Sequence, residues 1–365
     1  MKNKIFIIKL SDTNISPLFD LFNALEEKNY ELLFLSNDRQ LIRYCEENNK
    51  FIKKIKKFYA HVFIKLIYYK LKFKIKNIIC FGVWEKIIFT PIAKILKIKI
   101  VWIELPKEKN GKSNFILSFL LKKISGMAKS VVFKKIDKND LIKSGFASEK
   151  ITFIAPGINL KQHTRQENIF HGLAKNKNSQ SQKKFFTVGT AANLDCGQTI
   201  EILFGAIKKA LDVIPNLQII IIGEGEERKK LTWLAQKMEI GDLSWFVGEQ
   251  ACLNKWFGGF DIFTTTRVNA NLSDIFVLLN AMGAGLPIIS VENHGFDDII
   301  LDSQNGLLPP KDDSELLAGA IIKLQQNKML SKNLGQNAKD TIRDRMNLDL
   351  MAGDFLGVLE NNANF

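Results

Sequence analysis

The residues best placed to hold a ligand begin with a glycine-rich turn. In IIGEGEERKK (221–230), Gly223 and Gly225 let the backbone turn tightly and approach another group closely. The segment leads into a helix, and the amides at a helix start favour anions such as phosphate. The third glycine of a dinucleotide-binding fingerprint is missing, because Arg228 stands in its place. Two interpretations therefore stay open, a ligand contact and a plain turn from strand to helix.

A second candidate is the helix predicted over 273–284. Either Ser273 or Asp274 is expected to cap it, which leaves its first amides available to an anionic ligand. Small residues fill the last turn, Gly285 supplies the conformation that ends a helix, and Pro287 prevents its continuation. The start and the end of this helix are thus both predicted from local signals.

Two acids follow the next predicted strand. IISV (288–291) is an apolar run, and NHGFDD after it places Gly295, Asp297 and Asp298 where that strand would end. Carboxylates at this position can accept hydrogen bonds from sugar or ribose hydroxyls. They can equally cap the helix that follows, so the sequence leaves both roles open.

The elements that position these residues alternate between short apolar runs and helical segments. Runs such as KIFIIKL (4–10) and LQIIIIG (217–223) are largely apolar, which indicates strands buried on both faces of a parallel sheet. A polar, lysine-rich segment interrupts the alternation at 160–184. We therefore predict two doubly wound, Rossmann-like α/β domains that face each other across a cleft, with ligands beyond the carboxyl ends of the strands. The expected parts are an N-terminal domain (1–160), a linker (161–184), a C-terminal domain (185–340) and a last helix (341–365) packed on the N-terminal domain.

Two helices of the first half carry boundary signals of their own. Pro17 is expected near the start of a helix over 17–29. Asp137 or Asn139 is expected to cap a short helix that ends at Gly145.

Composition sets the class of protein. The chain has 365 residues, of which 46% are hydrophobic, enough to bury the cores of two globular domains. Its four cysteines lie far apart and only four histidines are present, so neither a disulfide framework nor a metal site is expected. The N-terminus shows no signal-peptide core, and no apolar run reaches about 18 residues. These features predict a cytoplasmic protein.

The net charge of +14 is concentrated in one part of the chain. Residues 51–100 contain thirteen lysines against one acid, Glu85, and the stretch 55–76 mixes lysine with aromatic and aliphatic residues. Such a stretch can lie on an anionic membrane surface, bind nucleic acid, or form a solvated face. The large apolar component and the absence of an arginine-rich or RNA-binding motif weigh against nucleic acid. The Lys-rich stretch 51–76 is thus a candidate contact with the inner membrane face, and a solvated face is the alternative.

Several segments together resemble the glycosyltransferases of family 4, which have the GT-B fold. The likeness is clearest from about 185 to 325, in FFTVGTAANLDCGQ, PNLQIIIIGEGEERKKLTWLA, LSWFVG, FDIFTTT, LLNAMGAGLPIIS and DSQNGLLPPKDDSELLAGAI. The resemblance implies that a sugar passes from a nucleotide diphosphate sugar to an acceptor, with retention at the anomeric carbon and with neither a metal nor another cofactor.

The resemblance also implies where the site lies. In the family, an Arg–Lys pair and peptide amides bind the donor phosphates, and two glutamates contact the sugar and the ribose. The matching positions and their polar neighbours give a donor side of Gly189, Thr190, Asn193, Gly223, Arg267, Ser273, Asp274, Asn280, Gly295, Phe296, Asp297 and Asp298. The acceptor side comprises Ser11, Asp12, Thr13, Asn14 and Glu104.

The family's charged groups are replaced at the positions that matter most. Asn193 stands in the arginine position, Cys196 in the lysine position, and Leu272 and Asn280 in the two glutamate positions. The glycine-rich loop of the first domain is replaced by residues 11–14. The glycines and prolines that shape the backbone of the site are retained, whereas the groups that compensate phosphate charge are absent.

The sequence supports two hypotheses of different classes. The first is a divergent glycosyltransferase that acts at the cytoplasmic membrane face on a lipid-linked or polysaccharide acceptor, with uncharged groups and Arg267 in place of the lost cations. The second is a GT-B-fold protein without turnover, serving as a partner subunit or as a module that binds nucleotide sugars or glycans. A retaining front-face reaction needs no protein base, because the leaving phosphate can take the acceptor proton. The first hypothesis therefore leads.

Overall fold

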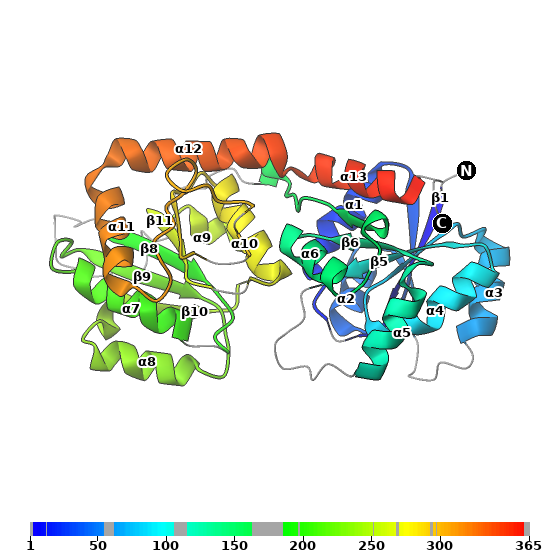
Figure 1. The fold of residues 1–365 in the computed structure, drawn as a ribbon. Coiled ribbons are helices and arrows are strands. Elements are labelled where there is room, and N and C mark those ends of the chain that lie inside the picture. The colour runs from blue at the N-terminus through cyan, green and yellow to red at the C-terminus, as the bar shows by residue number, and fades with distance from the viewer. Residues whose placement is uncertain are drawn as a thin grey trace. The chain divides into compact units, whose positions relative to one another are not determined.

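The computed structural model describes residues 3–11, 13–54, 62–105, 115–162, 185–195, 198–250, 252–267, 270–292, 295–296 and 298–360. The chain forms two compact units, each with a parallel sheet of its own (Figure 1). The first unit comprises Met1–Pro156 together with Leu348–Phe365, and the second comprises Gly157–Asn347.

The first unit contains a seven-stranded parallel sheet in the order β3-β2-β1-β4-β5-β6-β7. The strand order reverses between β1 and β4, because the chain runs outward from β1 to β3 and then returns beside β1. The strands are β1 (Asn3–Lys9), β2 (Tyr30–Ser36), β3 (Phe51–Lys54), β4 (Asn77–Cys80), β5 (Lys99–Glu104), β6 (Lys129–Val132) and β7 (Ile151–Phe153). The helices are η1 (Ser16–Leu18), α1 (Phe19–Glu27), α2 (Arg39–Glu47), α3 (Val62–Phe73), α4 (Val83–Ile95), α5 (Phe115–Ser125), α6 (Lys135–Lys143) and α13 (Leu348–Glu360), with short 3₁₀ turns η3 (Ser148–Lys150) in this unit and η4 (Leu160–Gln162) in the second.

Helices cover both faces of this sheet. On one face, Phe6 of β1 belongs to a core that includes Leu66 of α3 and Phe89 of α4. On the other face, Phe34 of β2 lies 5.7 Å from Phe22 of α1, measured between ring centroids. Residues 5–8 of β1 are accordingly all buried. The apolar run therefore indicated a central strand correctly.

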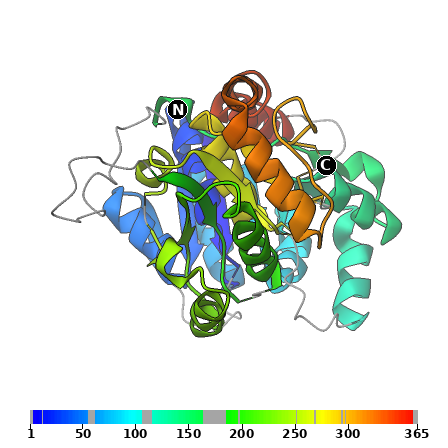
Figure 2. The same ribbon diagram turned by 90° about the vertical axis from the view of Figure 1, so that its left-hand side faces the viewer.

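The second unit repeats this plan with five parallel strands in the order β10-β9-β8-β11-β12. Its strand order reverses between β8 and β11. The strands are β8 (Phe186–Ala191), β9 (Leu217–Ile222), β10 (Ser244–Gly248), β11 (Ile262–Thr265) and β12 (Ile288–Ser290). The helices are α7 (Gln198–Ala210), α8 (Arg228–Lys237), η6 (Gly241–Leu243), α9 (Asn254–Phe257), α10 (Leu272–Gly283), α11 (Ser314–Gln326) and α12 (Lys328–Arg345). Figure 2 shows α7 and α11 side by side. The two sheets confirm the predicted α/β class with two doubly wound, Rossmann-like units.

The structure corrects two predicted helix starts. Pro17 lies in the 3₁₀ turn η1, and α1 begins only at Phe19. The residue that precedes α6 is Lys134, so neither Asp137 nor Asn139 caps this helix. Pro17 lies just before the α-helix that it was expected to open. Asp137 and Asn139 lie inside the helix that they were expected to cap.

The last helix, α13, belongs to the first unit and packs beside α1. The Tyr30 hydroxyl at the start of β2 donates to the Glu360 carboxylate at 2.5 Å. Burial, followed by this carboxylate, raises the pKa of Tyr30 to about 12. The Lys99 ammonium donates to the carbonyl oxygens of Leu359 and Glu360, both at 3.3 Å. The end of α13 is thus held by two strands of the first sheet.

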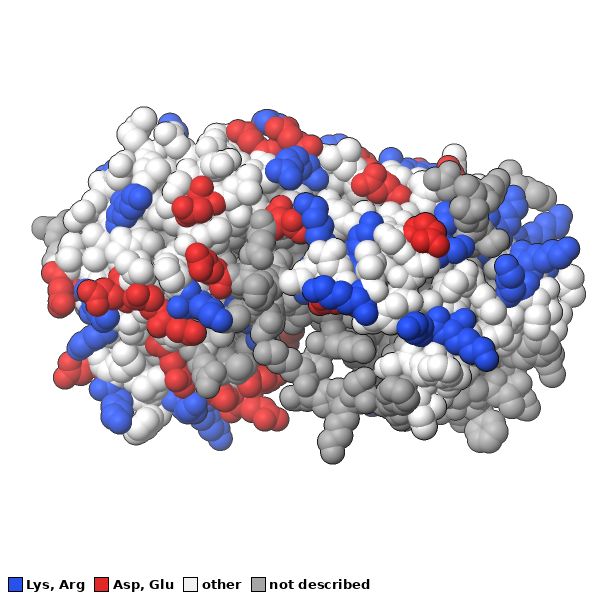
Figure 3. All heavy atoms as spheres, viewed as in Figure 1, with Lys and Arg blue, Asp and Glu red and all other residues white. Residues whose placement is uncertain are grey.

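Lysines and exposed apolar side chains share the surface of α3. Leu71 is 73% exposed and Tyr68 is 51% exposed, and the Lys72 ammonium lies 5.4 Å from the centroid of the Tyr68 ring. Basic side chains gather at the edge of the first unit in Figure 3. Residues 55–61 of the predicted Lys-rich stretch lie outside the described residues. No helix among the described residues combines the length and the apolar content needed to cross a bilayer.

Candidate functional site

In the second unit, the strand order reverses between β8 and β11. Ligands of doubly wound sheets bind at such a switch point, beyond the carboxyl ends of the strands. The loop after β8 carries Asn193, and the loop after β11 carries Arg267. Thr266, next to that arginine, donates its hydroxyl to the carbonyl of Thr199 in the first turn of α7 at 2.5 Å. Two of the predicted donor residues therefore lie in loops that begin at the same switch point.

The loop after β8 packs against the glycine-rich turn after β9. The Leu194 N–H donates to the Glu224 carbonyl at 2.9 Å, and the Glu227 N–H donates to the Leu194 carbonyl at 3.1 Å. Gly223 has a φ of +139°, and a Cβ added to it would lie 2.0 Å from the Ala192 carbonyl oxygen. A backbone contact within the protein therefore requires this glycine. The contact favours the plain-turn interpretation of the segment.

Asn193, in the position of the family's arginine, has an exposed side chain. Its Oδ1 accepts the N–H of Asp195 at 3.2 Å, and Oδ1 of Asp195 accepts the N–H of Glu226 at 3.1 Å. These bonds shape the loop after β8 without supplying a positive charge. Cys196, in the position of the lysine, lies outside the described residues.

Gly189 and Thr190 lie within β8 itself, and Thr190 is buried. A Cβ added to Gly189 would lie 2.0 Å from the ring of Phe260. The space that this glycine leaves open is therefore filled by an aromatic side chain of the protein. Packing against Phe260 is a sufficient reason for glycine at this position.

Arg267 lies beside Asp274, near the start of α10. Its Nε is 3.5 Å from Oδ2 of Asp274, but this buried Nε makes no hydrogen bond. Asp274 also accepts the N–H of Asn271, whose Oδ1 accepts the N–H of Asp274, both at 2.9 Å. Asn271 is therefore the N-cap, and the prediction that Ser273 or Asp274 caps α10 was wrong. The Asp274 carboxylate therefore contacts both Arg267 and the backbone of the helix cap.

The two positions of the family's glutamates lie on α10. Leu272 is buried, at 4% exposure, and the Asn280 amide donates to the Phe276 carbonyl one turn earlier at 2.6 Å. Ser273 is half-buried on the same helix. Gly285 follows with a φ of +74°, which confirms the predicted helix end.

The described residues after β12 are closely packed. Phe296 is buried, and a Cβ on Gly295 would lie 2.4 Å from the Cβ of Ala270. Asp298 is half-buried. Asp297 lies outside the described residues.

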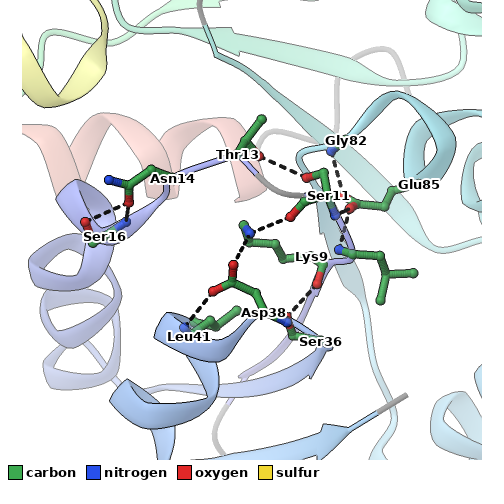
Figure 4. Close-up of polar contacts among 11 residues, drawn as sticks. Lys9, Ser11, Thr13, Asn14, Ser16, Ser36, Asp38, Leu41, Gly82 and Glu85 are labelled. Atoms are coloured by element: carbon green, nitrogen blue, oxygen red, sulfur yellow. Dashed lines mark hydrogen bonds and ion pairs between the residues drawn. The ribbon is translucent and has the colours of Figure 1, made fainter. Parts of the chain in front are cut away.

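In the first unit, the predicted acceptor residues Ser11, Thr13 and Asn14 lie in the loop after β1 (Figure 4). The hydroxyl oxygens of Ser11 and Thr13 are 2.9 Å apart and share a hydrogen bond. Oδ1 of Asn14 accepts both the N–H of Ser16 at 2.9 Å and its hydroxyl at 2.8 Å. Asp12 lies outside the described residues. The described side chains of this loop offer hydroxyl and amide groups rather than charge.

Two buried lysines at the carboxyl ends of the same sheet are each paired with a carboxylate. Lys9, with no exposed surface, lies 2.9 Å from Asp38, and Lys86 lies 2.8 Å from Glu104. Glu104, a predicted acceptor residue, is therefore held in an ion pair. Near it, at the start of α6, burial raises the pKa of Asp137.

Glu85 is the polar residue that sequence reasoning missed. It counted only as the single acid among thirteen lysines, yet its carboxylate is buried and accepts backbone N–H groups from two loops. Because glycine has no side chain, Gly82 and Glu85 form only the half of a capping box in which the N3 side chain accepts the N-cap N–H, and the sequence signal is correspondingly weak. Within the described part of the chain, no three His, Cys, Asp or Glu side chains are grouped to hold a metal ion.

The chain is similar to known glycosyl transferases in sequence and in fold. Residues 173–341 match the family model described as glycosyl transferases group 1. Through these residues, the chain is similar to the glycosyl transferases of group 1. It is 27% identical over 174 residues to the GtfA subunit of a UDP-N-acetylglucosamine–peptide N-acetylglucosaminyltransferase from Streptococcus parasanguinis, covering 44% of this chain and 34% of the relative. It is 24% identical over 156 residues to LpsE, a lipopolysaccharide core biosynthesis glycosyltransferase from Rhizobium meliloti, covering 43% of this chain and 45% of the relative.

The matches thus span between about a third and a half of the length of these curated relatives. The fold extends further than the sequence match. HepE from Anabaena, in a crystal structure with UDP, superposes with a TM-score of 0.81 at 14% identity, covering 98% of this chain and 99% of that one. The chain therefore has the GT-B fold over nearly its whole length.

Proposed function

We propose that this protein transfers a sugar from a nucleotide diphosphate sugar to a lipid-linked or polysaccharide acceptor. The observation that carries the proposal is the match of residues 173–341 to group 1 glycosyl transferases. The likeness in fold to a protein that binds UDP supports a nucleotide donor. The relative named for lipopolysaccharide core biosynthesis supports a glycan acceptor.

The donor diphosphate would lie at the β8/β11 switch point of the second unit. Arg267 would supply a guanidinium there, although its Nε also lies 3.5 Å from the Asp274 carboxylate. A guanidinium has five N–H donors, so one carboxylate neighbour does not exhaust it. The exposed Asn193 and the half-buried Asn280 add uncharged polar groups. This set is weaker than the family's Arg–Lys pair, and we expect correspondingly weaker donor binding.

The proposed reaction needs no basic side chain. The bond between the anomeric carbon and the leaving phosphate oxygen breaks, and the acceptor oxygen bonds to the same face of that carbon. The acceptor proton passes to the leaving phosphate. Leu272 and Asn280 in the glutamate positions are compatible with this route, because neither has to carry a proton.

Calorimetry tests the donor site. UDP and GDP should be compared with uridine and guanosine, and at least one diphosphate should bind more tightly than its nucleoside. Replacing Arg267 by Gln should weaken that binding roughly 10- to 100-fold, because a charge-assisted hydrogen bond contributes about 1.5–3 kcal/mol. The matched control is Asp274→Asn, which keeps an acceptor for the helix cap but removes the competing charge, and it should bind at least as tightly as the wild type. Absence of diphosphate binding at millimolar concentration would refute the donor assignment.

We further propose that the α3 surface contacts an anionic membrane. Tyr68, Leu71 and Lys72 of α3 are exposed, and the exposed Lys74 directly follows the helix. Apolar side chains flanked by lysines suit the boundary between lipid headgroups and acyl chains. Flotation with vesicles of anionic lipid should recover the protein at low salt, and uncharged lipid or high salt should not. Equal recovery with both lipids would contradict this proposal.

The second candidate function is a GT-B-fold protein without turnover. The observation that favours it is the absence of a carboxylate at positions 272 and 280, together with the tight packing around Gly189 and Gly223. This candidate predicts binding of a nucleotide sugar without release of the free diphosphate. The two functions are therefore separated by incubating UDP-sugars and GDP-sugars with the protein and a membrane extract, and by measuring diphosphate release.

A further inference from the structure

The first sheet has a switch point of its own, between β1 and β4. Register pairs Ile8 at the end of β1 with Cys80 at the end of β4. Beyond these residues the two loops diverge, one toward α1 and the other toward α4. Backbone N–H groups at such a divergence, next to a helix start, form the usual place for an anionic ligand in a doubly wound sheet.

These N–H groups are already taken by one side chain of the protein. Oε1 of Glu85 accepts the N–H groups of Leu10 at 2.5 Å and Ser11 at 2.8 Å. Oε2 accepts the N–H groups of Phe81 at 2.9 Å and Gly82 at 2.7 Å. Each carboxylate oxygen thus binds two amides of one loop, and Figure 4 shows Glu85 lying between Ser11 and Gly82.

Glu85 is 1% exposed, so water does not compensate its charge. Hydrogen bonds from backbone N–H groups to a carboxylate are among the strong hydrogen bonds of proteins. The two loops are also packed tightly at this point, because a Cβ on Gly82 would lie 2.7 Å from the Cβ of Ser11. The arrangement is that of a bound anion, except that the anion is covalently part of α4.

The cations around this edge do not create a second anion site. Lys9 donates to the Ser11 carbonyl at 2.6 Å and pairs with Asp38, and Lys86 pairs with Glu104. An anionic ligand would therefore meet the Glu85 charge without these two lysines free to offset it. Uncharged hydroxyl groups meet no such penalty, and the Ser11–Thr13 hydroxyl pair keeps one O–H proton beyond the hydrogen bond that it shares.

We propose that the Glu85 carboxylate occupies the anion site of the first unit, fixes the loop after β1, and excludes phosphate and other anions from it. Glu85 is a positioning residue in this account, since it acts through the backbone of the loop.

Chemical rescue of Glu85→Ala is the test, and it requires no sugar transfer. The variant frees four N–H donors and a space that a small carboxylate fits. Acetate should raise the melting temperature of the variant and move the amide resonances of Leu10, Ser11, Phe81 and Gly82 toward their wild-type positions. Acetamide, which has the same shape without the charge, should do neither at equal concentration. Inorganic pyrophosphate should perturb these amides in the variant and leave them unchanged in the wild type.

The matched control is Phe89→Ala, which opens an apolar space on the same helix without freeing an amide. Its melting temperature should fall and should respond equally to acetate and acetamide. Equal rescue of Glu85→Ala by both molecules, or pyrophosphate bound at these amides of the wild type, would overturn the proposal.

Glu85→Gln keeps the test decisive if the alanine variant does not fold. Its carboxamide has one acceptor oxygen, and its NH₂ group faces N–H donors of one loop. The proposal therefore expects a clearly lower melting temperature than the wild type, and a wild-type value would overturn it. Neither result depends on whether the protein transfers sugar, so a failure of this inference and a failure of the proposed function are separate observations.

Discussion

The two units of this protein differ sharply in charge. The first unit contains 31 Lys and Arg residues against 17 Asp and Glu, whereas the second contains 21 of each. The whole net charge of +14 therefore belongs to the first unit. The unit that carries the family match, and in which we place the donor diphosphate, is neutral overall.

If the donor diphosphate binds in the neutral unit, as we propose, then net charge does not locate phosphate chemistry in this protein. In the first unit, two buried lysines at the carboxyl ends of the sheet, Lys9 and Lys86, are paired with carboxylates, while lysines such as Lys72 and Lys74 are exposed. The excess charge of that unit can act at a surface, but these two buried cations are committed to internal contacts. In the second unit, Arg267 lies in the loop after β11, at the switch point, and its Nε is 3.5 Å from Oδ2 of Asp274.

The largest loss of stability should come from removing a buried lysine of the first unit. Lys9→Met leaves Asp38 without its partner, and the free energy of unfolding should fall by about 3 kcal/mol, the lower end for a buried pair because Asp38 is 21% exposed. Urea denaturation measures the change. Arg43→Met removes the exposed Arg43–Glu47 pair and serves as the control, for which we expect no measurable difference. Equal losses in the two variants would show that burial does not distinguish these cations.

A packing change in the neutral unit should have the next largest effect. Gly189→Ala places a methyl group against the Phe260 ring, and we expect a loss of about 1–3 kcal/mol in the free energy of unfolding. Gly319→Ala, in α11 of the same unit, meets nothing within 4 Å and should stabilise the protein by about 0.5–1 kcal/mol. If Gly189→Ala is tolerated without loss, the space at Gly189 is open, and its role as a ligand contact would regain support.

Replacing two lysines by glutamate in either unit compares the contributions of the two units to membrane binding. Lys72→Glu with Lys74→Glu should weaken binding to anionic vesicles by more than an order of magnitude, since each lysine near such a surface contributes roughly fivefold. Lys229→Glu with Lys237→Glu makes the same change in net charge on α8 of the second unit. That pair should leave vesicle binding nearly unchanged. A similar loss for both pairs would mean that total charge, rather than the α3 surface, governs the interaction.

The smallest effect concerns the link between α13 and β2. The pKa of Tyr30 is raised to about 12, above its usual value of 10, because burial and Glu360 disfavour the charged form. The resulting stabilisation is present below pH 10 and is lost as the pH rises from 10 to 12, and we expect about 1 kcal/mol after allowing for solvent screening. Stability measured across this range should fall more steeply for the wild type than for Tyr30→Phe. Parallel curves would contradict the raised pKa.

The strands and the class of fold were predictable because burial on both faces leaves a continuous apolar run, as in β1 and β9. The end of α10 was predictable because Gly285 and Pro287 act locally. The start of the same helix was missed because Asn271 and Asp274 cap each other, and single-residue preferences do not reveal such a pair.

The candidate site was less accessible to sequence reasoning, because its groups are determined by contacts between distant segments. Glu85 and Ser11 are 74 positions apart, and nothing local connects them. Gly223 resembled a ligand contact until its approach to Ala192 was known. The sequence can thus indicate which residues belong to a candidate site, but it does not show which distant groups these residues contact.

The most direct test is a crystal structure of the protein soaked with UDP and with GDP. Our account predicts diphosphate density beyond β8 and β11, next to Arg267, and no anion at the amides that Glu85 binds. Diphosphate density against those amides, or an empty β8/β11 switch point at saturating nucleotide, would contradict it.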